Sequence, residues 1–185
     1  MSLLKLDDER RDIELALRQT EFRQRFDIKQ QWVVSVADLQ GYLLRYTPDI
    51  VHFSGHGSTS GQIILEDNAG NNHPISLRAL SQTFSLLKDN VRCVVLDACY
   101  SRQQAQAIAQ HVDCVVGMSS TINDAAAIRF AAAFYQALGD GQSIKTAFDL
   151  GSTQISLENL DGQDTPQLLS VNSNPADVAI VNDNS

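Results

Sequence analysis

The sequence predicts an α/β fold, a three-layer α/β/α sandwich with a largely parallel central sheet. Two short apolar runs rich in β-branched residues, 49–53 and 91–96, each break off into small and polar residues, which is typical of strands buried on both faces. The stretch between them is long enough for the right-handed crossover that parallel neighbours require. Neither a repeat nor a linker divides the 185 residues, so we expect a single domain over 1–185.

Ahead of the first central strand, the pattern predicts two helices and a strand. Acidic residues near the start of the chain can cap a helix over 7–22, and an apolar run predicts a strand at 31–35. Ser35 with Asp38 three residues later resembles a capping box that opens a second helix. Pro48 prevents this helix from continuing into the central strand.

The segment between the two central strands is expected to hold a hairpin and a helix. The turn-rich stretch 67–72 joins two short strands at 62–66 and 73–75. Ser76 then caps a helix over 77–87, in which the apolar residues follow helical spacing.

Alternating helices and strands continue after the second central strand. We expect a helix at 101–111 and a strand at 114–117. Two further helices are expected at 124–138 and 141–155. The remaining segment, 158–185, is polar and turn-rich, with an expected edge strand at 178–181.

Composition and net charge indicate which partners the protein can bind and in which cellular compartment it works. The net charge of −8 argues against a nucleic-acid backbone as the main partner. No apolar run approaches the roughly 20 residues that span a bilayer, and no secretory signal is visible. The three cysteines are most simply read as reduced thiols. We therefore expect a cytoplasmic protein that binds neither nucleic acid nor membrane.

The residues that carry chemistry directly follow the two central strands. His56 and Cys99 come after the first and the second strand, and chemistry in parallel sheets collects at the carboxyl ends of the strands. Neighbouring strands lie about 4.8 Å apart, so the two side chains can form a Cys–His pair in which the imidazole activates the thiol. The backbone amides of Gly57 and Cys99 are candidates for an oxyanion hole.

At these residues the sequence resembles a known family. The segments His-Phe-Ser-Gly-His56-Gly57 and Leu-Asp97-Ala98-Cys99-Tyr100-Ser101 resemble the two signature motifs of CHAT domains, bacterial relatives of caspases, metacaspases and separase. Their spacing is also similar to that family, and the likeness covers most of 12–157. The resemblance implies a caspase-like fold and peptide hydrolysis, with a catalytic dyad of His56 and Cys99 and an oxyanion hole that includes Gly57.

The resemblance also bears on Asp97, two residues before the expected nucleophile. In metacaspases the matching position helps an acidic pocket hold Lys or Arg, so the resemblance implies a substrate pocket at Asp97 and cleavage after a basic residue. An alternative stays open, in which Asp97 caps the helix that follows Cys99.

The beginning of the chain departs from the family pattern. Related domains begin with an apolar strand before the first helix, whereas here only 2–6 precede Asp7. We therefore expect the first strand to be missing or truncated. Because that strand is internal to a caspase-like sheet, its loss would leave unpaired strand edges.

Other ligand sites find little support in the sequence. His52 lies inside a strand run and is expected to be a core residue or to support the site. A metal site of His52, His56 and Cys99 lacks the usual ligand spacing, and the glycines of 54–61 form no phosphate-binding motif. We expect no metal and no cofactor.

Two classes of function follow from these observations. The first is a cysteine endopeptidase that cleaves protein or peptide substrates through His56 and Cys99. The second is a catalytically silent interaction module, or a dormant protease that needs an activating protein partner or a fused regulatory domain. The presence of both dyad residues favours the first class.

Overall fold

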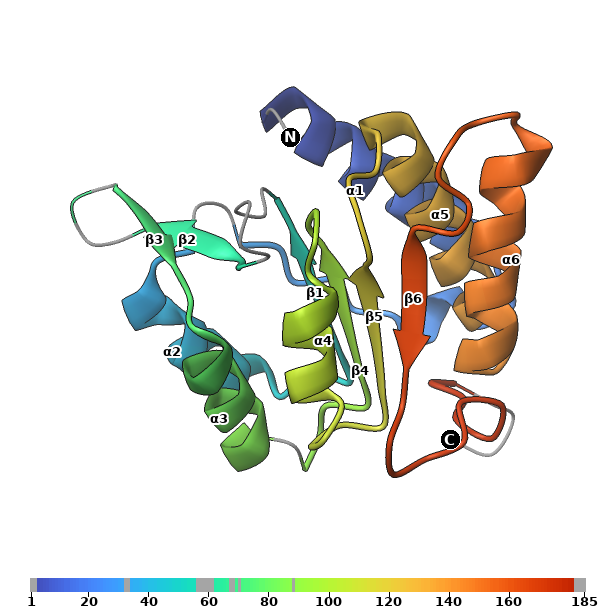
Figure 1. Cartoon of the computed structure of the whole chain (residues 1–185). Helices are drawn as coiled ribbons and strands as arrows, with labels where there is room; N and C mark the ends of the chain where they lie inside the picture. Colours follow the sequence, from blue (N-terminus) through green and yellow to red (C-terminus); the bar gives the residue numbers. More distant parts are fainter. Residues whose placement is uncertain are drawn as a thin grey trace.

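The computed structural model describes residues 3–31, 34–55, 62–66, 69, 71–87 and 89–181. It confirms the expected α/β/α sandwich with a largely parallel sheet (Figure 1). The strands of the central sheet lie in the order β1-β4-β5-β6, with bounds Ile50–Ser54, Cys93–Asp97, Cys114–Met118 and Pro166–Leu169. The first three run parallel, and β6 pairs antiparallel to β5.

The pairing of β1 with β4 positions the expected site. The two strands are direct parallel neighbours, in a register that sets Ile50 opposite Cys93 and Ser54 opposite Asp97. The amide of Gly55 extends this pairing with a hydrogen bond to the Asp97 carbonyl (3.2 Å). Both strands therefore end at the same edge of the sheet.

Helices cover both faces of the sheet because successive strand residues point to opposite sides. On one face, Cys93 and Val95 pack against α1, α5 and α6, with bounds Leu3–Arg18, Asp124–Gly139 and Ile144–Leu157. On the other face, Val94 and Leu96 pack against α2, α3 and α4, with bounds Val36–Tyr46, Leu77–Leu87 and Arg102–Ile108. Figure 1 shows the two helical layers on either side of the strands.

Several expected elements are confirmed with shifted ends. The hairpin consists of β2 (Ile64–Glu66) and β3 (Asn72–Pro74), with part of its turn outside the described residues. Ser35 caps α2 as the capping-box pattern predicts, because its hydroxyl accepts the Asp38 amide (3.2 Å). The helix after Cys99 is shorter than expected and ends at Ile108.

The prediction of an edge strand at 178–181 is wrong. Ala179 forms only an isolated bridge to Ser143, while Val178 and Val181 bury their side chains near the start of α6. Their apolar pattern therefore reflects packing against the core rather than strand pairing. The edge strand is instead β6, whose residues lack the β-branched character that usually marks a strand.

The segments before β1 differ from expectation in two places. The first helix covers Leu3–Arg18 instead of 7–22, and a short 3₁₀ helix at Arg23–Arg25 follows it. Trp32 and Val33, the centre of the strand expected at 31–35, lie outside the described residues. In the part of the chain that the structure describes, β1 lies at one end of the central sheet.

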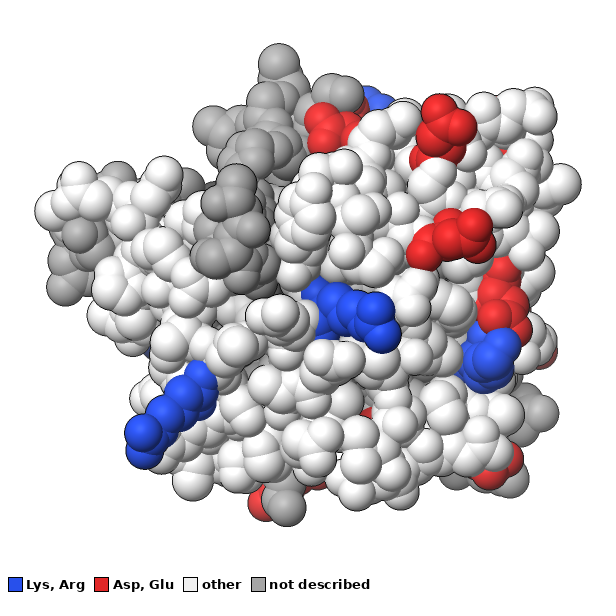
Figure 2. Space-filling view, in the orientation of Figure 1, with Lys and Arg blue, Asp and Glu red and all other residues white. Residues whose placement is uncertain are grey.

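The surface carries scattered charges on the face shown in Figure 2, where Lys and Arg side chains lie apart from one another. None of the described helices is both long and apolar enough to cross a lipid bilayer.

The contact between β5 and α4 gives a test of the packing. A Cβ atom on Gly117 would lie 2.6 Å from the Ala105 Cβ and 3.4 Å from the Arg102 Cα. We therefore expect Gly117→Ala to lower the free energy of unfolding by about 1–3 kcal/mol through overpacking. A Cβ atom on Gly41 of α2 would have no neighbour within 4 Å, so Gly41→Ala should be neutral or stabilise by up to about 1 kcal/mol. Urea denaturation of both variants measures the difference, and equal stabilities would contradict the packing.

Candidate active site

Cys99 lies in a tight turn between the end of β4 and the start of α4. The turn closes through a hydrogen bond from the Ser101 amide to the Ala98 carbonyl (3.2 Å). Tyr100 has a φ of 61°, in the left-handed region that bulky residues rarely adopt. Such local strain often occurs at functional positions. The cysteine itself is half-buried, so the turn holds a partly accessible thiol at the carboxyl edge of the sheet.

Ser101 fixes this turn to the sheet. Its side chain is fully buried, donates to the Leu96 carbonyl (2.9 Å) and accepts the Met118 amide (2.9 Å). One hydroxyl thereby joins the ends of β4 and β5 beside Cys99. Gln104 of α4 is also buried and accepts the Ile63 amide (2.8 Å). Neither side chain was predicted to have a role from the sequence.

Asp97, the last residue of β4, lies under α1 and is only 3% exposed. Burial and the nearby Glu9 carboxylate raise the pKa of Asp97 well above its ordinary value. Among the hydrogen bonds of the described residues, none joins Asp97 to the amides of α4, and the N-cap of that helix is Ser101. The alternative in which Asp97 caps the helix is therefore not what this structure shows.

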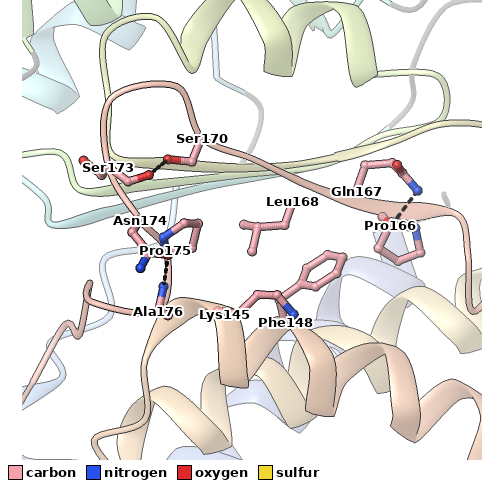
Figure 3. A pocket seen from close by; sticks show the side chains of 10 residues that line it. All are labelled: Lys145, Phe148, Pro166, Gln167, Leu168, Ser170, Ser173, Asn174, Pro175 and Ala176. Carbon is pink, nitrogen blue, oxygen red and sulfur yellow. Dashed lines mark hydrogen bonds between the residues drawn. The ribbon is translucent and has the colours of Figure 1, made fainter.

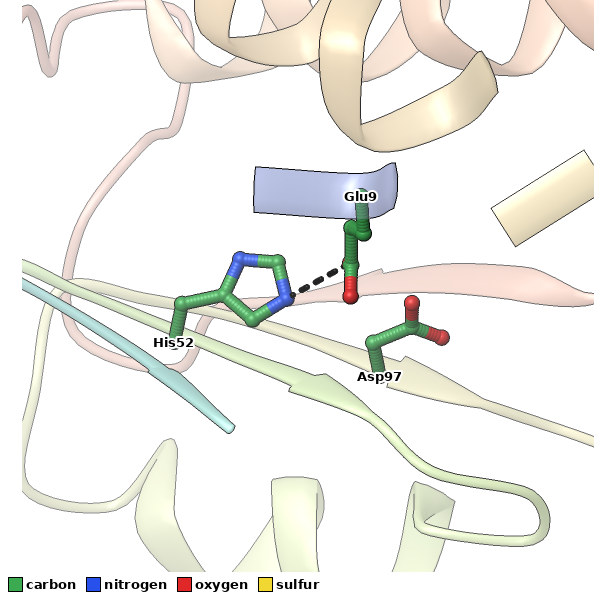
Figure 4. A group of neighbouring side chains, drawn as sticks. All are labelled: Glu9, His52 and Asp97. Carbon is green, nitrogen blue, oxygen red and sulfur yellow. Dashed lines mark ion pairs between the residues drawn. The ribbon is translucent and has the colours of Figure 1, made fainter. Parts of the chain in front are cut away.

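Glu9 and His52 complete a buried polar cluster with Asp97 (Figure 4). Glu9 Oε1 lies 3.2 Å from His52 Nε2, and the Ser54 hydroxyl donates to the other oxygen of Glu9. On its other side, His52 Nδ1 lies 3.0 Å from the Tyr135 hydroxyl. Burial acts to raise the pKa of Glu9, yet His52 and the hydrogen bonds to the carboxylate hold that pKa below its ordinary value.

One signal in the sequence could have revealed Glu9. It precedes Ile13 and Leu17 at intervals of four residues, so it lies on the same face of α1 as the apolar residues that pack against the core. An acidic residue on the buried face of a helix indicates a polar partner in the interior. The role of Tyr135 had no comparable signal, because aromatic residues are common in the core.

His56 and Gly57 lie outside the described residues, so the dyad and the oxyanion hole remain predictions. The structure does bring Asp97 and Cys99 to the expected edge of the sheet. A groove elsewhere, between β6, α6 and the segment after β6, has a volume of about 640 Å³ (Figure 3). Among the described residues that line it are Phe148 and Leu168, but neither Asp97 nor Cys99.

A family model and the name of one relative point to the same family. A family model described as CHAT domain matches residues 7–169. A Roc-COR-CHAT protease from an unknown prokaryotic organism is 32% identical over 128 residues, which cover 66% of this chain and 12% of the relative. A probable protease from Gillisia limnaea is 25% identical over 142 residues, which cover 76% of this chain and 25% of the relative.

A solved structure resembles the fold. The secreted C11 cysteine protease from Bacteroides thetaiotaomicron, solved with an irreversible peptide inhibitor, matches with a TM-score of 0.53 and 13% sequence identity. The match covers 74% of this chain and 45% of the other chain. At this identity the likeness concerns the fold alone, and it agrees with the expected caspase-like sandwich. The matched segment spans less than half the length of each of the three proteins.

The three cysteines should differ sharply in reactivity. Cys93 and Cys114 are fully buried in the sheet, where burial raises the pKa of Cys114 to about 12 and that of Cys93 well above its ordinary value. Both therefore stay neutral thiols at pH 9, whereas the half-buried Cys99 is accessible. Mass spectrometry after brief iodoacetamide treatment should find Cys99 labelled first, at both pH 7 and pH 9. Equal labelling of all three in urea is the control, and early labelling of Cys93 or Cys114 in the folded protein would contradict the assignment.

Proposed function

Because this chain belongs to the CHAT domain family, we propose that it is a cysteine endopeptidase that hydrolyses proteins through a His56–Cys99 dyad. The register of β1 and β4 is the observation that supports it most. Ser54 lies opposite Asp97 in this pairing, and each stands two residues before one member of the proposed dyad. The two residues thus follow equivalent positions on neighbouring parallel strands.

The proposed reaction follows the chemistry of activated thiols. His56 accepts the proton of the Cys99 thiol, and the resulting thiolate sulfur attacks the carbonyl carbon of the scissile peptide. The amides of Gly57 and Cys99 donate to the oxyanion that forms. His56 then gives its proton to the leaving amine, which departs as the acyl-enzyme thioester forms. Water, deprotonated by His56, attacks the thioester and releases the carboxylic acid and the free thiol.

The relatives support this reaction class and suggest a regulatory context. Both curated relatives are named as proteases, and one name joins Roc and COR to CHAT. We propose that this domain also works with a regulatory domain or an activating protein partner. The thiols of the described structure are free, which fits action in a reducing cytoplasm.

Asp97 is proposed to select Lys or Arg before the scissile bond. Its carboxyl group lies at the end of β4, two residues before Cys99, and burial favours its neutral form. A cationic side chain that reached Asp97 would favour the carboxylate and pair with it. An acidic substrate side chain would be repelled by the Glu9 carboxylate.

The burial of Asp97 favours a dormant form as the second candidate. Glu9 of α1 lies against this carboxyl group, which is 3% exposed. A substrate side chain can reach it only after α1 shifts. Coverage of Asp97 by α1 fits a protease that is inactive until a partner binds. It fits equally an interaction module that does not turn over substrate.

Loss of either dyad residue should abolish peptide cleavage. We expect Cys99→Ala and His56→Ala to lower kcat/KM by about 1,000-fold or more, because the thiolate cannot form or attack. His73→Ala, at an exposed position of β3, serves as the control and should keep full activity. Turnover of a fluorogenic peptide library measures the change. Cleavage that persists in Cys99→Ala would rule out the dyad, and an inactive unsubstituted chain with an intact fold would favour the interaction module.

Asp97→Asn should reduce cleavage after basic residues more than it alters the thiol. We expect kcat/KM for Arg and Lys peptides to fall by about 30-fold or more, because the substrate cation loses its partner. The alkylation rate of Cys99 should change little, which separates recognition from nucleophile activation. A peptide-library profile of the unsubstituted protein gives the second check. A preference for Asp or a small apolar residue before the cut would show that Asp97 does not form the pocket.

A further inference from the structure

Three side chains from distant parts of the sequence meet beside the candidate active site. Glu9 comes from α1, His52 from β1 and Asp97 from β4. Figure 4 shows that they point toward one another, and one nitrogen and two carboxyl oxygens all lie within 4.8 Å of one another. Glu9 is 2% exposed and Asp97 3%, so the cluster lies inside the protein.

Each of the three side chains has a buried polar atom that lacks a hydrogen-bond partner. Glu9 Oε1, His52 Nε2 and Asp97 Oδ2 are all buried and none forms a well-oriented hydrogen bond. The 3.2 Å approach of Glu9 Oε1 to His52 Nε2 is an ion-pair contact that is not aligned as a hydrogen bond. A buried polar group without a hydrogen bond destabilises the fold, so three such atoms in one cluster indicate a missing partner.

The remaining polar atoms of Glu9 and His52 are held in place by neighbouring side chains. The Ser54 hydroxyl donates to the second oxygen of Glu9, and the Tyr135 hydroxyl lies 3.0 Å from His52 Nδ1. Metal-binding histidines and carboxylates are typically oriented in this way by hydrogen bonds from behind. With Tyr135 at Nδ1, the Nε2 atom is the one that faces the two carboxyl groups.

We propose that Glu9, His52 and Asp97 bind a divalent transition-metal ion, for which Zn²⁺ is the best match. Ligand atoms around tetrahedral zinc lie about 3.3–3.6 Å apart, given Zn–N and Zn–O bonds of about 2.0–2.2 Å. The Glu9–His52 contact of 3.2 Å is close to this spacing. Three protein ligands leave the fourth position for water.

The chemistry of the ligands favours zinc over the alkaline-earth ions. Imidazole nitrogen suits Zn²⁺ and its neighbours in the first transition series, whereas Ca²⁺ and Mg²⁺ prefer sites made of oxygen atoms alone. A divalent ion also balances two buried carboxylates, and it would compete with a basic substrate side chain for Asp97.

The ion would join α1 to the sheet. Glu9 lies more than forty residues from His52, which in turn lies more than forty residues from Asp97, so bound metal crosslinks three separate segments. The sequence favoured no metal site, and the set of His52, His56 and Cys99 that it was tested against differs from this one, because Glu9 is brought to the site only by the packing of α1. Metal binding should therefore stabilise the folded chain.

The test is made in a Cys99→Ser background, because a free thiolate is itself a zinc ligand. The chain is treated with a chelator and titrated with ZnCl₂ by calorimetry. We expect one equivalent to bind with micromolar affinity or better, and the melting temperature to rise. Binding no stronger than millimolar, or a preference for Ca²⁺ over Zn²⁺, would overturn the proposal. Since this background lacks the nucleophile, the result is independent of the proposed peptidase.

Variants then assign the ligands. His52→Ala, Glu9→Gln and Asp97→Asn should each weaken zinc binding by about 100-fold or more, a larger loss than that for the outer hydrogen-bond partners. The matched controls are His73→Ala and Asp149→Asn, which remove exposed groups and should bind zinc normally. Binding that survives all three ligand substitutions would overturn the assignment.

A spectroscopic measurement on the Cys99→Ser chain identifies the ligand types even if a ligand variant fails to fold. Co²⁺ added to the Cys99→Ser chain should give the visible bands of a four-coordinate site with nitrogen and oxygen ligands. A thiolate charge-transfer band would instead assign the metal to Cys93 or Cys114 and overturn the proposal. Retention of the native circular dichroism spectrum shows which variants can be interpreted.

Discussion

The parallel pairing of β1 with β4 is the constraint on which the rest of the molecule depends. Buried strands must satisfy their backbone groups within the sheet, and the apolar residues on each face must be covered by helices. Five residue pairs in strict register, from Ile50–Cys93 to Ser54–Asp97, meet the first need. The two helical layers meet the second. Because the register is fixed, the loops that carry the proposed chemistry leave the sheet side by side.

Burial of ionisable groups sets the character of the site. Glu9, Asp97 and Tyr135 are almost fully buried, although charged groups are seldom buried without compensation. Their pKa values shift in different directions, raised for Asp97 and Tyr135 and lowered for Glu9. Perturbed values of this kind concentrate at functional sites. An apolar cluster would have served packing equally well, so the polar cluster is better explained by recognition or metal binding than by stability.

The sequence allowed the sandwich, the neighbouring central strands and the edge occupied by Cys99 to be predicted. These features depend on local patterns, namely buried β-branched runs and the turn residues that end them. The edge strand at Pro166–Leu169 was missed because its pairing with β5 is set by tertiary packing rather than by composition. The grouping of Glu9 with Asp97 was missed for a similar reason, since nothing local shows that α1 covers the end of β4. His56 and Gly57 remain predictions, because they lie outside the described residues.

Besides covering the core, α1 contacts the end of β4 through Glu9. The helix contacts α5 through its apolar face, and its buried carboxylate lies at the end of β4 beside the turn that carries Cys99. A movement of α1 would therefore reach the turn that carries Cys99 through the contact of Glu9 with Asp97, at the end of β4. A partner that displaced the first helix would therefore also displace the end of β4, two residues before the proposed nucleophile.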